Sequence, residues 1–223
     1  MYVKDASKKH LPGEKAVIKI KYQIEEITKD LAQCPDDTNE GARETQEYIS
    51  GLQGGLRQCM EPWITPNSDT WNEVAALSHL ADHKCSSTPW LLNCLIDVLP
   101  SSGVHRKAVA GGYIVFVLMT KVPGKELDSG DMGNLMPVER ENLREDFKDA
   151  IKKVWECGLE CRDKGFHNLK WDKEERKWQV MPIFYIVDFE HSSFASEKRQ
   201  KSLEFTEDEY WYWGLSESYY IRK

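Results

Sequence analysis

The sequence predicts an α+β fold for this chain of 223 residues. Short Val- and Ile-rich runs with strand-like patterns stand beside longer stretches in which apolar residues recur at helical spacing. With 40% hydrophobic and 11% aromatic residues, the chain can bury either one substantial core or two small lobes that share a cleft. We therefore expect a globular protein.

The first predicted element is a half-buried strand at residues 16–22, where successive side chains alternate between the two faces of the strand. Ile18 and Ile20 belong to its apolar face, while Val17 and Lys19 lie on the opposite face. Turn-forming residues that precede this strand make residues 2–4 the tail of an antiparallel partner. Residues 23–67 are polar and rich in turn formers, which predicts an insertion with one helix at residues 42–52.

The next predicted element is a helix from Thr70 to Leu80. Thr70 and Glu73 have the spacing of a capping box, and apolar residues follow at helical spacing. Two strands at residues 89–92 and 112–119 come next. A loop with the sequence Ser-Ser-Gly separates them, and a Pro-Gly pair ends the second strand.

A long amphipathic helix is predicted from residue 138 to 157, after a linker rich in glycine and aspartate. Gly158 ends this helix. The short apolar runs 169–171 and 184–187 flank a charged turn, which suggests a hairpin that Pro182 interrupts on one side. Finally, Thr206 and Glu209 form a capping box for a Tyr/Trp-rich helix, closed by Gly214, whose aromatic side chains we expect in the core.

Charge and composition exclude several classes of partner. The formal net charge is −7 and no long Lys/Arg block is present, so nucleic acid and anionic membranes are poor candidates. The apolar run 108–119 is too short to span a bilayer, which takes about 20 residues. With no visible signal peptide, we expect an intracellular, cytoplasmic protein whose six cysteines are reduced thiols.

Several segments occur in an order that has a known counterpart. These are Val-Ile-Lys at 17–19, Glu73 on a helix, Gly-Gly-Tyr-Ile-Val at 111–115, Cys-Arg-Asp with Asn168 five residues after Asp163, and Ile-Val-Asp-Phe-Glu at 186–190. Together they resemble the compact protein-kinase-like proteins of filamentous fungi. The resemblance covers roughly residues 14–22 and 70–215. It implies a bilobal fold, with a small β-rich N-lobe at 1–121 and a reduced, mainly helical C-lobe at 122–223.

The same resemblance implies an ATP and Mg²⁺ site. Lys19 would pair the phosphates and Glu73 would hold that lysine. Asp163 would orient the acceptor hydroxyl, and Asn168 and Asp188 would bind magnesium. The residues expected to contact the nucleotide are Val17 above the adenine, Lys19, and, from the hinge between the lobes, Met119 and Lys121. The implied activity is transfer of the ATP γ-phosphoryl to a hydroxyl of an unknown acceptor, either a protein Ser/Thr or a small molecule.

Departures from the family pattern favour an alternative, an inactive pseudokinase that acts as a nucleotide-binding or interaction module. A glycine-rich phosphate loop is missing, which a shortened N-terminus or a lost element would equally explain. Glu190 replaces the usual glycine after Asp188-Phe189 and adds a negative charge beside the metal site. Cys161 replaces the usual histidine of the catalytic loop, which concerns the packing of that loop rather than its chemistry. A chain that does nothing alone is the third possibility.

Each candidate residue also has a simpler interpretation. Lys19 alone could be a solvated strand lysine, and Glu73 could serve only the helix cap. The loop with Asp163 and Asn168 could be a plain turn. Pairs of histidines and cysteines at helical spacing could contribute to zinc sites, although buried thiols and ordinary polar roles are favoured: His79 with His83, and Cys157 with Cys161.

Overall fold

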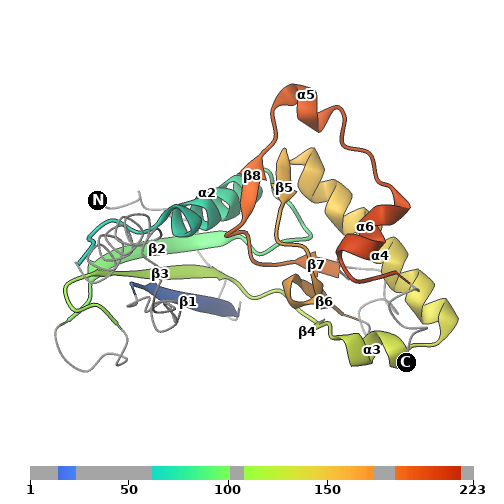
Figure 1. Cartoon of the computed structure of the whole chain (residues 1–223), viewed down its shortest axis with the longest axis horizontal. Helices are drawn as coiled ribbons and strands as arrows, with labels where there is room; N and C mark the ends of the chain where they lie inside the picture. The colour runs from blue at the N-terminus through green and yellow to red at the C-terminus, as the bar shows by residue number, and fades with distance from the viewer. Residues whose placement is uncertain (1–14, 24–61, 101–107, 173–183, 217–223) are drawn as a thin grey trace, which may run out of the picture. The chain divides into compact units, whose positions relative to one another are not determined.

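The computed structural model describes residues 15–23, 62–100, 108–172 and 184–216 (Figure 1). The chain divides into two compact units. Described residues 20–23, 62–66, 95–100 and 108–116 belong to the first unit, and all other described residues belong to the second. Every residue predicted to bind ATP or magnesium, or to take part in phosphoryl transfer, therefore lies in the second unit. The predicted lobe boundary after residue 121 stays a prediction.

Mixed α+β secondary structure confirms the predicted class. A three-stranded sheet has the order β1-β3-β2, with β1 at Ala16–Tyr22, β3 at Tyr113–Thr120 and β2 at Leu91–Val98 (Figure 1). The strand predicted at 89–92 thus starts later and runs longer than expected. In central β3, Val115 and Val117 are fully buried, as expected for a strand that has a neighbour on each side.

The prediction of which face of β1 is buried was wrong. The side chains of Ile18 and Ile20 are 60% and 52% exposed, whereas Lys19 and Lys21 are only partly exposed. The physical reason is charge pairing, because the ammonium group of Lys19 is drawn toward carboxylates. Alternation therefore located the strand correctly and misassigned its inner face.

Helix α2 spans Ser68–Asp82 and confirms the predicted helix, but its start differs. Its N-cap is Asn67, whose Oδ1 accepts hydrogen bonds from the backbone N and the Oγ1 of Thr70 at 3.0 and 2.7 Å. Thr70 is therefore inside the helix, and the predicted capping box with Glu73 was wrong. Asn is as good an N-cap as Thr, so the cap could sit three residues earlier.

The long helix α4, Pro137–Glu156, packs against strands β5 at Leu159–Cys161 and β7 at Phe184–Ile186 (Figure 1). It confirms the predicted helix, and Gly158 follows its C-cap in the left-handed region with φ +76°. Strand β6, Leu169–Trp171, pairs antiparallel with β7, as the hairpin prediction required. Phe147 of α4 meets Phe184 of β7 edge to face, with ring centroids 5.7 Å apart.

Several short elements of the described chain were not predicted. Strand β4, Lys125–Glu126, and helix α3, Ser129–Asn134, lie in the predicted linker, and β4 pairs with β6. Strand β8, Ser192–Phe194, pairs with β5, and helix α5 covers Glu197–Gln200. Each has only two to six residues, too few for a periodic pattern to be visible.

The last described helix, α6, spans Glu207–Tyr212, with Thr206 at the N-cap as predicted. The capping-box hydrogen bonds are not made, because the carboxylate of Glu209 pairs with Lys164 Nζ at 2.9 Å instead. Core packing is confirmed for Tyr210 and Trp213, which are 5% and 0% exposed. It was wrong for two others that are about half exposed, Trp211 and Tyr212.

Four sequence-based predictions lie outside the described residues: the strand tail at 2–4, the helix at 42–52, the Ser-Ser-Gly loop and the hairpin segment around Pro182. The cysteines that the structure does describe carry free thiols. In the described ranges, no helix combines the length and apolar character that crossing a bilayer requires.

Candidate functional site

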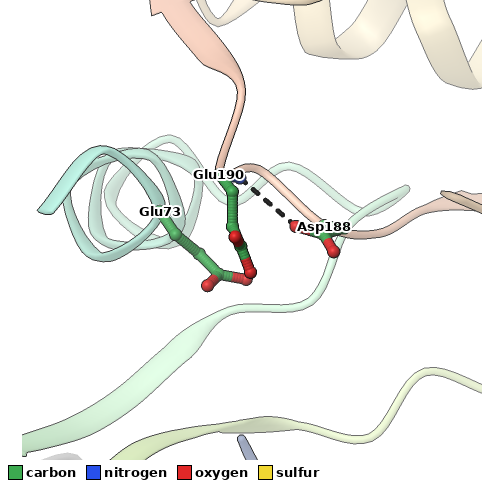
Figure 2. Close-up of side chains that lie close together, drawn as sticks. All are labelled: Glu73, Asp188 and Glu190. Atoms are coloured by element: carbon green, nitrogen blue, oxygen red, sulfur yellow. Dashed lines mark hydrogen bonds between the residues drawn. The ribbon is translucent and has the colours of Figure 1, made fainter. Parts of the chain in front are cut away.

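The ammonium group of Lys19 lies among three carboxylates. Its Nζ is 3.0 Å from Glu73 Oε1, 3.2 Å from Asp188 Oδ2 and 2.6 Å from Glu190 Oε1. Figure 2 shows the carboxylate ends of Glu73 and Glu190 converging, with Asp188 beside them. We call these four residues the Lys19 cluster.

The Lys19 cluster is partly shielded from water. The side chain of Glu73 is 2% exposed, and those of Lys19, Glu190 and Asp188 are 30%, 29% and 37% exposed. Partial burial tends to lower the pKa of Lys19, but the carboxylates, Glu73 foremost, outweigh it and raise the pKa above its ordinary value. Lys19 therefore stays protonated. With each of the three carboxylates counted as −1 and the ammonium group as +1, the cluster has a formal charge of −2.

Two of the carboxylates come from one turn after β7. Asp188 has φ +63°, a left-handed conformation that Asp tolerates better than most residues. The backbone N–H of Glu190 donates to Asp188 Oδ1 at 3.3 Å. Between these acids, Phe189 is fully buried and fixes the turn in the core. Alternation of acid, aromatic and acid thus places both carboxylates at the site.

A second group of polar side chains occupies the loop between β5 and β6. Asn168 Nδ2 donates to the backbone O and to Oδ2 of Asp163 at 3.0 and 3.2 Å. His167 Nε2 lies 3.2 Å from Asp163 Oδ2. The hydrogen bond from His167 and, to a smaller extent, that from Asn168 lower the pKa of Asp163, so its carboxylate is ionised at neutral pH.

The loop and the Lys19 cluster are joined through backbone. The N–H of Val187 donates to the carbonyl of Asn168 at 2.9 Å, immediately before Asp188. At the other end of the loop, Arg162 N donates to His191 O at 2.8 Å, immediately after Glu190. The segment 187–191 is therefore hydrogen-bonded to both ends of the loop.

A pocket of about 310 Å³ connects these groups, near the lower limit for small-molecule sites. Asp163 does not line it, but it is hydrogen-bonded to two residues that do, His167 and Asn168. The other residues predicted to bind nucleotide or metal all line this one pocket: Val17, Lys19, Glu73, Met119, Lys121, Asn168 and Asp188.

The predicted hinge segment, which contains Met119 and Lys121, has part of its backbone already hydrogen-bonded within the protein. Thr120 N donates to Trp90 O, and Lys121 N donates to Lys15 O, both at 3.0 Å. Lys121 is exposed at the pocket, and Val122 beside it is buried. The side chains of this segment are therefore available to a ligand, whereas these two amide donors are occupied.

Sequence reasoning missed Lys170 at the site and the contact that Glu190 makes there. Lys170 lines the pocket, because its neighbours in β6, Leu169 and Trp171, are buried on the opposite face. Strand alternation with Asn168 could have found it. Glu190 was recognised only as an added negative charge, and its contact with Lys19 was not foreseen. The spacing of two residues between Asp188 and Glu190 was the signal in the sequence that could have placed both side chains at the site.

The structure gives different outcomes for the simpler interpretations of Lys19, Glu73 and the histidine pair. Lys19 is ion-paired rather than solvated, and Glu73 does not serve the helix cap. His79 Nε2 and His83 Nδ1 contact backbone carbonyls at 2.7 and 2.9 Å. Within the described ranges, the one group of three candidate metal-ligating side chains is the carboxylates of the Lys19 cluster, so no such group surrounds these histidines or Cys157.

Cys161 has a structural place at the start of the loop. It pairs with Ser192 across β5 and β8 and is 7% exposed, and burial raises the pKa of its thiol to about 12.

Compared with known proteins, the chain matches no protein-family model and no curated sequence.

Proposed function

We propose that this chain is a protein-kinase-like domain that binds ATP with Mg²⁺ in the pocket and transfers the γ-phosphoryl group to a hydroxyl. The observation that carries the proposal is the ion pair of Lys19 with Glu73 and Asp188 in a pocket also lined by Asn168. These four residues come from four separate segments of the chain. An ammonium group oriented by a buried carboxylate is suited to hold phosphate oxygens.

The donor set fits a magnesium ion. Asn168 uses its Nδ2 for the loop, which leaves its Oδ1 as an oxygen ligand, and Asp188 offers a carboxylate that is 37% exposed. Such hard oxygen donors are the ones that Mg²⁺ prefers. When bound, the ion would neutralise charge on the β and γ phosphates.

The proposed chemistry assigns one task to each part of the chain. Asp163, ionised and oriented by His167 and Asn168, accepts the proton of the acceptor hydroxyl. The acceptor oxygen forms a bond to the γ-phosphorus while the bond from that phosphorus to the β-γ bridging oxygen breaks, and ADP leaves. Lys19 holds phosphate oxygens during this transfer, and Glu73 orients Lys19. The acceptor is a protein Ser/Thr or a small molecule.

One observation favours a second candidate, the pseudokinase that binds a nucleotide without turnover. Glu190 Oε1 is the closest of the three carboxylates to Lys19 Nζ, at 2.6 Å. A phosphate would compete with this carboxylate for the same ammonium group. Binding can survive such competition while positioning for transfer is lost.

Binding of Mg-ATP to the purified chain tests both candidates, and phosphoryl transfer separates them. We expect the midpoint of thermal unfolding to rise with Mg-ATP, because a ligand at 100 times its dissociation constant adds about 2.7 kcal/mol. Asp188→Asn is the matched variant, since Asn tolerates the left-handed backbone at this position and removes only the charge. It should bind Mg-ATP at least about tenfold more weakly. A wild type with no shift would overturn both candidates.

A further inference from the structure

We propose that Glu190 is a second anchor for Lys19, and that it makes phosphate binding at the Lys19 cluster depend on a divalent cation. This inference rests on the proposed function, since it concerns the ligand of the same pocket. Glu190 would be a positioning residue, because it acts on the ligand through Lys19.

The hydrogen-bonding capacity of Lys19 is the first step of the argument. A lysine ammonium group has three N–H donors. Lys19 Nζ has three carboxylate partners within 3.2 Å: Glu73, Asp188 and Glu190. Its donors are therefore fully used, and a phosphate oxygen can reach Nζ only if one carboxylate withdraws.

The three partners differ in how easily they can withdraw. Glu73 is 2% exposed on helix α2, so moving its charge would leave it buried without Lys19 beside it. Asp188 has a short side chain on a left-handed backbone. Glu190 is longer and 29% exposed, so it can rotate toward water at the least cost. Glu190 is therefore the group that a phosphate displaces.

Charge then makes the displacement depend on a cation. The formal charge of the cluster is −2 with Glu190 and would be −1 without it. Figure 2 shows the carboxylate ends of Glu190 and Glu73 close together, where the ammonium group of Lys19 offsets their mutual repulsion. Once a phosphate shares that ammonium group, this compensation is weaker. An incoming polyphosphate adds further negative charge, which a divalent cation offsets.

A double-mutant cycle tests the anchor independently of any ligand. The variants are Lys19→Met, Glu190→Gln and the two combined, each unfolded in urea. The cycle isolates the interaction free energy between Lys19 and Glu190 from the contributions of the other contacts of Glu190. We expect a coupling of at least about fivefold in the unfolding equilibrium constant, or about 1 kcal/mol. Additive effects would overturn the inference.

Titration with ATP, in EDTA and in excess MgCl₂, tests the cation dependence. Without metal, Glu190→Gln should bind ATP about tenfold more tightly than the wild type, and excess Mg²⁺ should narrow this difference. Glu204→Gln is the control, because it removes the same charge from an exposed position outside the cluster. It should behave as the wild type.

The outcomes separate this inference from the proposed function. Mg-ATP binding by the wild type, with the same metal dependence in Glu190→Gln, would overturn the role of Glu190 and leave the proposed function standing. No Mg-ATP binding by the wild type would overturn the proposed function, and the ligand-dependent part of the inference with it.

Discussion

The Lys19 cluster and the loop 163–168 supply the two halves of the proposed site, and they are held in different ways. Lys19 bonds to Glu73 and Asp188, which are 54 and 169 positions away in the sequence. In the loop, Asp163 bonds to His167 and Asn168, only four and five positions away. Long-range folding thus builds the cluster, whereas local backbone geometry builds the loop.

Burial shows the same contrast. The side chain of Glu73 is 2% exposed, while the side chains of Asp163 and His167 are 46% and 60% exposed. In the same loop, only the uncharged partner Asn168 of this hydrogen-bonded group is buried. Charges that are shielded from water interact more strongly than exposed ones. We therefore expect the cluster to contribute to both stability and binding, and the loop to contribute chiefly to chemistry.

The largest expected effect is on turnover, in the loop. Asp163→Asn should reduce kcat by about 10²- to 10⁴-fold, because it removes the group that accepts the hydroxyl proton. The dissociation constant for Mg-ATP should stay within about twofold, since Asp163 does not line the pocket. Phosphoryl-transfer rates and nucleotide titrations of the wild type and the variant, measured side by side, check that kcat falls while the dissociation constant does not change. Equal residual rates in wild type and variant would favour the pseudokinase.

An intermediate effect on stability should distinguish the two halves. Lys19→Met should lower the free energy of unfolding by about 2 kcal/mol, because three carboxylates would lose the cation between them and only Glu73 is fully buried. The matched loop variant, His167→Gln, removes an exposed partner of Asp163 and should cost less than about 0.5 kcal/mol. Urea unfolding measures both. Equal losses would contradict the contrast between cluster and loop.

Local periodicity in the sequence located the elements that carry the loop. The loop follows α4 and leads into the β6–β7 hairpin, and both elements have visible periodicity. The strand at β1 was equally visible, but its buried face was misjudged. Burial of Lys19 depends on carboxylates far away in the sequence, which alternation within one strand cannot reveal.

Competing local signals explain the other differences. Asn67 and Thr70 are both good N-caps, and the pattern of apolar residues in α2 does not distinguish them. Glu73 consequently had two interpretations, and the N-cap at Asn67 together with the 3.0 Å contact between Glu73 and Lys19 decides between them. Lys170 and Glu190 each lie two residues from a predicted site residue, yet reaching the pocket or Lys19 depends on tertiary packing.

A further prediction concerns Cys161, which lies at the buried start of the loop. Burial raises the pKa of its thiol from 9.0 to about 12. Because the thiolate is the reactive form, alkylation at pH 8 should be about a thousandfold slower in the folded chain than in urea. Iodoacetamide labelling followed by peptide mass spectrometry measures both rates.

The same shift fixes the sign of a pH dependence. Between about pH 9 and pH 12 the unfolded chain releases the Cys161 proton while the folded chain retains it. The unfolded state then binds fewer protons, so this thiol makes the free energy of unfolding fall as the pH rises through that window. Cys161→Ala should reduce this fall. Equally fast labelling of folded and unfolded chains would mean that the loop opens at its start. The buried Cys161 would then not hold the exposed functional side chains of the loop in place.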